Sequence, residues 1–190
     1  MPRGAHARSG APSPAQPSPA PTSRPALAGS HSVEVTTRGG PFAGVSAAVV
    51  ERRALKMLGH LASPRARARV ELSVALVDDA TIRDLNRTWR RKDKPTDVLA
   101  FPLVQPPGPV APAGAIGDVI ISVPTARRQA KAHRRPLLDE VTMLLAHGLL
   151  HLCGFDHGND ADEQHMNAHT AELCTAAARR GPSPARGAKR

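Results

Sequence analysis

Three histidines lie close together near the carboxyl end of the sequence, at His147, His151 and His157, in the stretch HGLLHLCGFDH. A helix through this stretch would place His147 and His151 on one face, separated by about 6 Å along the helix axis. Gly154 can end that helix in a left-handed turn, which would bring His157 back towards the same face. The spacing therefore predicts that the three imidazoles share one metal ion.

The donor set indicates which metal and which kind of site to expect. Three neutral imidazoles with an open fourth position are typical of catalytic zinc, whereas a structural zinc site is closed by a fourth side chain. Cys153 is the candidate fourth ligand, but it follows His151 by two residues and so faces away from it; we expect it in the core. His165 and His169 share the four-residue spacing but have no third partner, so we assign them to helix packing and to the surface.

Peptide hydrolysis is one alternative, because metzincin proteases use the spacing HExxHxxGxxH. These enzymes need the glutamate that follows the first histidine as a general base. Gly148 occupies that position here, so the sequence disfavours a peptidase. Asp156 is a possible base, although an aspartate beside a metal ligand more often orients that ligand.

A second group of candidate residues is basic and precedes a predicted strand. It consists of Arg87, Arg90, Arg91, Lys92 and Lys94. A guanidinium matches phosphate better than an ammonium does, whereas Arg91 and Lys92 are best explained as part of a solvated face. Aromatic residues make up only 2% of the chain and tyrosine is absent. We therefore expect platforms for base stacking to be nearly absent and phosphate contacts to dominate.

Hydrophobic periodicity defines the elements that must position these residues. Alternation predicts strands at residues 31–37 and 69–77, and strand-like composition predicts two more at residues 97–102 and 115–123. Helical spacing predicts helices at residues 41–61, 79–89, 124–132, 137–153 and 160–178, the second of them capped by Asp78 or Asp79. This order predicts an α/β fold, a single domain with a small mixed β-sheet packed by helices and with the zinc site at the end of a helix.

Composition separates the predicted domain, residues 31–178, from two tails. Residues 1–30 and 179–190 are rich in proline, alanine and basic side chains and contain no acidic residue, so we expect both to be disordered. The tails account for much of the net charge of +10. The two cysteines form no CxxC pair, and no apolar run has the length of a membrane span. We therefore expect a cytoplasmic protein.

Three motifs resemble those of one family, the YbeY endoribonucleases, which are bacterial rRNA maturation factors. HGLLHLCGFDH resembles the family signature HGxLHLxGYDH, with Phe155 in place of tyrosine. LNRTWRRKDKPTDVLAFP resembles LNxxYRxKDxPTDVLSFP, with Trp89 in place of tyrosine and Ala100 in place of serine. Gly117 and Asp118 match a GD pair in a strand of the family. The resemblance extends over about residues 33–173, and His169 departs from it, because relatives tend to be apolar there.

The resemblance implies a function and a set of roles. It implies that His147, His151 and His157 bind one zinc ion and that Arg90 is the functional arginine of the second motif. It also implies action on single-stranded RNA, processing of the 3′ end of small-subunit rRNA and ribosome quality control. The implied partners are an rRNA precursor and the small ribosomal subunit or its proteins, with no membrane and no specificity for DNA. The alternative is a ribosome-associated assembly factor with a structural metal and little nuclease activity.

Overall fold

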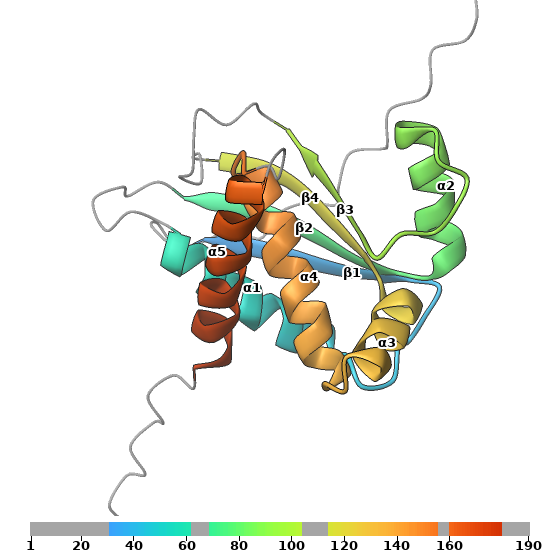
Figure 1. The fold of residues 1–190 in the computed structure, drawn as a ribbon, viewed down its shortest axis with the longest axis horizontal. Coiled ribbons are helices and arrows are strands. Elements are labelled where there is room, and N and C mark those ends of the chain that lie inside the picture. Colours follow the sequence, from blue (N-terminus) through green and yellow to red (C-terminus); the bar gives the residue numbers. More distant parts are fainter. Residues whose placement is uncertain (1–30, 62–68, 104–113, 156–159, 180–190) are drawn as a thin grey trace, which may run out of the picture.

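A computed structural model describes residues 31–61, 69–103, 114–155 and 160–179, so residues 1–30 and 180–190, nearly all of both predicted tails, lie outside the described residues. The described strands form one mixed sheet (Figure 1). Its order is β1 (Ser32–Arg38), β2 (Val70–Val77), β4 (Gly114–Ser122) and β3 (Val98–Pro102). β1, β2 and β4 are parallel, and the edge strand β3 is antiparallel to β4. The predicted small mixed sheet is confirmed.

Helices cover the two faces of the sheet unequally (Figure 1). α1 (Ala47–Leu61), α4 (Leu137–Leu152) and α5 (Asp160–Ala178) share one hydrophobic core with the sheet, and α3 (Val123–Ala132) contributes its first turn to it. α2 (Asp79–Arg90) packs on the opposite face through Ile82, which contacts Val77 and Leu99. The predicted α/β domain is therefore a sheet with most of its helices on one side.

Local sequence signals explain the burial pattern of β2 and the start of α2. In β2, Val70, Leu72, Val74 and Leu76 are buried, as the alternation predicts. The Asp78 side chain caps α2 by accepting a hydrogen bond from the backbone N–H of Thr81 at 2.8 Å. No helix in the described part of the chain is long and apolar enough to cross a membrane.

The predicted start of the first helix at residue 41 was wrong, because α1 begins at Ala47. Gly44 has a φ of 83°, which is incompatible with a right-handed helix. The Val45 N–H donates to the Phe42 carbonyl at 3.2 Å and closes a turn there. The helical bonds begin only at Ser46, whose carbonyl accepts from Val49 and Val50. The apolar residues before Ala47 therefore belong to a turn.

Candidate metal centre

His147 and His151 lie side by side on the last two turns of α4. Their Nε2 atoms are 3.2 Å apart, and their rings meet nearly at right angles with centroids 4.8 Å apart. Both side chains are only partly buried, whereas the residues of α4 around them are mostly buried. The predicted placement of the two imidazoles on one helix face is confirmed.

The turn that follows α4 has the geometry predicted for Gly154. This residue adopts a φ of 85°, and its N–H donates to the His151 carbonyl at 3.0 Å. The Phe155 N–H donates to the Leu150 carbonyl at 3.1 Å, which completes a Schellman motif. His157, the third predicted ligand, and Asp156 lie outside the described residues. Within the described ranges no group of three or more metal-ligating side chains converges, so a three-histidine set stays a prediction.

The same turn fixes the orientation of His151. Its Nδ1 lies 3.1 Å from the Phe155 carbonyl oxygen. Because a carbonyl only accepts, Nδ1 must carry the proton and donate it, which leaves the lone pair on Nε2, the atom that faces His147. Histidines that bind metals usually hold their second nitrogen in this way.

The spacing of the two nitrogens tests whether a zinc ion fits. Two imidazole nitrogens bound to one tetrahedral zinc at about 2.0–2.1 Å lie roughly 3.3 Å apart. The observed separation between the Nε2 atoms of His147 and His151 is 3.2 Å. The pair therefore fits zinc both in donor type and in spacing.

A cavity of about 260 Å³ opens beside His147. The described residues that line it are His147 from α4 and Glu163, Met166 and Asn167 from α5. Sequence reasoning missed this contribution of α5. Nearly every side chain in the first two turns of that helix is polar or exposed, so the sequence carried no signal for which of its faces meets the site.

Comparison with known proteins identifies the family. The family model described as Endoribonuclease YbeY matches residues 44–178, more than half of the chain. The chain belongs to the YbeY family. It is 49% identical over 128 residues to the Endoribonuclease YbeY of Anaeromyxobacter sp. (strain Fw109-5), with 65% of each protein covered. It is 53% identical over 104 residues to that of Myxococcus xanthus (strain DK1622), covering 55% of this chain and 35% of the relative.

The matched region is only part of these YbeY relatives, since it spans between about one third and two thirds of their length. A solved structure extends the likeness to the fold. The solution structure of TM1509 from Thermotoga maritima superimposes with a TM-score of 0.53, over 76% of this chain and 89% of that one, at 23% identity. It supports the α/β architecture of this YbeY protein.

Gly148 in the YbeY signature packs directly against the sheet. A Cβ atom at this position would lie 2.7 Å from Val119 Cγ1 and 3.3 Å from Val98 Cγ2. A glutamate here would therefore point into β3 and β4 instead of the cavity. This gives the absence of a protease-type glutamate a steric reason that the sequence alone did not supply.

The other polar residues near the YbeY signature have structural positions. Cys153 is fully buried in the core, as expected, and burial raises the pKa of its thiol to about 11. His169 packs against the Phe155 ring with centroids 5.1 Å apart and lies 3.2 Å from Glu172, and His165 is exposed. Their assignment to packing and surface is confirmed.

Arg90, the arginine singled out by the YbeY resemblance, is the last residue of α2 and is exposed. α2 and the histidine pair lie on opposite faces of the sheet, and the connection after Arg90 leads to the edge strand β3. The structure thus does not bring Arg90 to the histidines through α2 itself. A role for its long side chain at the edge of the sheet stays a prediction.

Proposed function

We propose that this protein is a zinc-dependent endoribonuclease that cleaves single-stranded RNA. We infer further that it acts in the cytoplasm on the 3′ end of small-subunit rRNA precursors and in ribosome quality control. The observation that carries the proposal is the 3.2 Å separation of the His147 and His151 Nε2 atoms, with His151 oriented by the Phe155 carbonyl. Membership in a family described as endoribonucleases supplies the reaction class.

His147, His151 and His157 would hold the zinc ion. Bound there, zinc would supply a Lewis acid for a phosphate oxygen of the RNA. Arg90 would contact the phosphate near the scissile bond and neutralise the charge that develops on it. The partners would be the rRNA precursor and the small subunit or its proteins.

The cavity beside His147 favours this proposal over an assembly factor with a structural metal. A structural zinc site is closed by protein ligands on all sides, whereas a catalytic site must admit substrate. His147 borders an open space of about 260 Å³ on the side of α5. Cys153, the nearest candidate for closing the site, is buried in the core instead.

Cleavage assays with the purified full chain test the proposal. The substrates are a single-stranded RNA, the same RNA in a duplex, and single-stranded DNA, each with chelator and after zinc is restored. We expect cleavage of single-stranded RNA alone, loss of cleavage with chelator, and recovery with zinc. Chelator-resistant cleavage, or a folded zinc-loaded protein that cleaves no RNA and leaves rRNA precursors unprocessed in cells, would contradict the proposal.

A further inference from the structure

Trp89 is the most exposed aromatic side chain of the molecule. The chain has one tryptophan, three phenylalanines and no tyrosine. The three phenylalanines are all partly buried, whereas 57% of the Trp89 side chain is exposed on the last turn of α2. Phe101 of β3 supports it from the sheet side, with an edge-to-face contact and a centroid distance of 5.9 Å. A large apolar ring is thus held in place without being covered.

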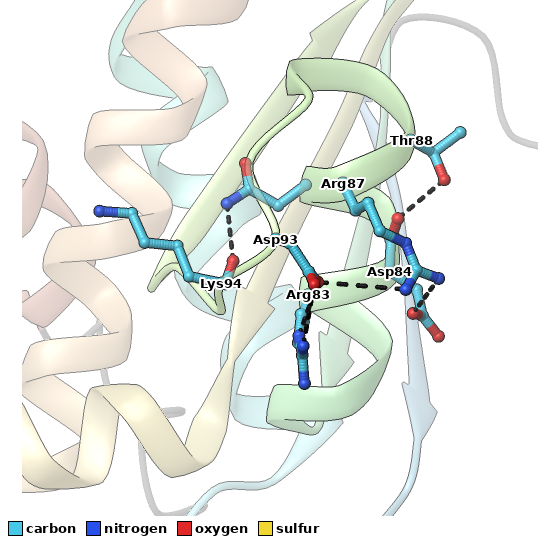
Figure 2. Close-up of polar contacts among 7 residues, drawn as sticks. Arg83, Asp84, Arg87, Thr88, Asp93 and Lys94 are labelled. Atoms are coloured by element: carbon cyan, nitrogen blue, oxygen red, sulfur yellow. Dashed lines mark hydrogen bonds and ion pairs between the residues drawn. The ribbon is translucent and has the colours of Figure 1, made fainter.

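The connection after Trp89 carries cations with no acidic partner. Arg83 pairs with Asp93, and Arg87 pairs with Asp84, each with an N–O distance of 2.8 Å (Figure 2). Asp84 and Asp93, the aspartates of this segment, are therefore already paired. Arg90, Arg91, Lys92 and Lys94 are exposed, and none of them forms an ion pair with another described residue. Four uncompensated charges therefore lie within five residues of the exposed indole along the chain.

The backbone of this connection is held in one conformation. The buried Asn86 side chain donates to the Lys94 carbonyl at 2.8 Å, a contact drawn beside the Lys94 label in Figure 2. The Lys92 N–H donates to the Asn86 carbonyl at 3.2 Å. Arg91 occupies the left-handed region with a φ of 57°, a conformation that costs energy for a residue with a side chain. The cations are thus presented by a fixed turn, which lowers the entropy lost when they bind a ligand.

We propose that Trp89 is a base-stacking platform for single-stranded RNA and that the unpaired cations beside it bind the adjacent phosphates. The proposal deepens the proposed nuclease function by placing part of its substrate on the α2 face and the β3 edge. An exposed aromatic ring among cations is the pattern by which proteins hold single strands without reading sequence. A protein partner is the less favoured occupant, because four uncompensated charges oppose a dry apolar contact.

Fluorescence of the single tryptophan tests the platform directly. Because no other tryptophan or tyrosine is present, emission reports on Trp89 alone. A single-stranded oligoribonucleotide is titrated into the full chain in the presence of chelator, and an equally long ribose-phosphate chain without bases is the matched probe. We expect strong quenching by the RNA and little by the base-free chain. RNA binding without quenching, or equal quenching by both probes, would overturn the proposal.

Affinity measurements on variants test whether Trp89 stacks on a base of the RNA or only packs against Phe101. Loss of a stacked base weakens binding on the order of 5- to 150-fold, which we expect for Trp89→Leu, whereas Trp89→Phe should retain most of the affinity. Arg91→Ala with Lys92→Ala should reduce the salt dependence of binding by about 0.7 in log–log slope for each phosphate that is no longer neutralised. Lys131→Ala, which removes an exposed charge from α3, is the control.

An unchanged RNA affinity in Trp89→Leu would overturn the stacking platform and leave a protein as the next candidate partner of this surface. If that variant fails to fold, the quenching measured on the parent protein still tests whether RNA bases stack on Trp89. The quenching assay measures binding alone, because the chelator prevents cleavage. If RNA quenches Trp89 in this assay but is not cut in the cleavage assay with zinc, the nuclease function is refuted and the stacking platform is not.

Discussion

The Nδ1 atom of His151 lies 3.1 Å from the carbonyl oxygen of Phe155, four residues further along the chain. The helix stop at Gly154 creates this relationship, since it turns the backbone so that the Phe155 carbonyl faces back onto α4. One turn thus ends the helix and selects the tautomer of a predicted ligand. The orientation of His151 therefore depends on a residue that has no side chain.

Gly154→Ala should weaken zinc binding more than it weakens the fold. A left-handed conformation costs an alanine about 1–2 kcal/mol, and strain at the turn would shift the carbonyl that orients His151. Loss of such an orienting interaction typically costs 10- to 100-fold in metal affinity. Zinc affinity by competition with a chelating dye and thermal unfolding measure the two effects.

The matched control for this change is Gly59→Ala. Gly59 lies in α1, and a Cβ added to it would meet nothing within 4 Å beyond its chain neighbours and the backbone of its own helix. Alanine there should therefore stabilise the helix by about 0.5–1 kcal/mol and leave zinc binding alone. Zinc affinity unchanged by Gly154→Ala would show that the turn does not orient the ligand.

The double variant His147→Ala, His151→Ala should contain no zinc after purification, because the two nitrogens at 3.2 Å are both removed. Metal analysis of the purified protein measures this. His60→Ala with His165→Ala removes two exposed histidines elsewhere and should keep the metal content of the parent. Full zinc occupancy in the first variant would place the metal elsewhere.

Gly148→Ala should destabilise the protein, because the new Cβ would lie 2.7 Å from Val119. Overpacking of this kind costs about 1–3 kcal/mol, which urea unfolding detects. Gly148→Glu should fail to create a peptidase, because its side chain would face the sheet. Zinc-dependent cleavage of a peptide library by either the parent or this variant would contradict the steric argument.

Structural features that depend on residues close together in the chain were predictable from sequence. The alternation in β2, the Asp78 cap and the glycine turn at Gly154 each depend on a few adjacent residues, and the structure has all three. The start of α1 was predicted wrongly. The prediction followed the helical spacing of apolar residues and neglected Pro41 and Gly44, which favour a turn. The placement of α2 across the sheet and of Glu163 beside His147 depends on how whole elements pack, which no local pattern encodes.

Cys153 should make the stability of the fold fall as the pH rises from about 9 to about 11. Burial raises the pKa of its thiol from 9.0 to about 11. Because the folded-state value is the higher one, the contribution of this thiol is complete below about pH 9 and is lost as the pH rises to about 11. Urea unfolding across this interval should show a steeper loss for the parent than for Cys153→Ala. Equal slopes, or alkylation of Cys153 in the native protein at about pH 8, where an exposed thiol already reacts, would indicate an accessible thiol.

Arg90→Ala should keep the thermal stability and zinc content of the parent and lose most RNA cleavage. The side chain is exposed and forms no ion pair with the described residues, so its removal should change stability by no more than about 0.5 kcal/mol. Removing a preorganised donor that stabilises a developing charge typically costs 10²- to 10³-fold in rate, about 3–4 kcal/mol. Arg90→Lys should rescue little, because an ammonium cannot donate two parallel bonds to phosphate.

The control for Arg90 is Arg87→Ala on the same helix. It removes the same charge from the preceding turn, but Arg87 is already paired with Asp84 at 2.8 Å, so cleavage should fall only slightly. Single-turnover cleavage of a labelled RNA by the parent, Arg90→Ala, Arg90→Lys and Arg87→Ala compares the four directly. Because α2 lies across the sheet from the histidines, equal losses in Arg90→Ala and Arg87→Ala would point to general attraction of RNA. A selective loss at Arg90 would mean that its guanidinium reaches the scissile phosphate past the β3 edge.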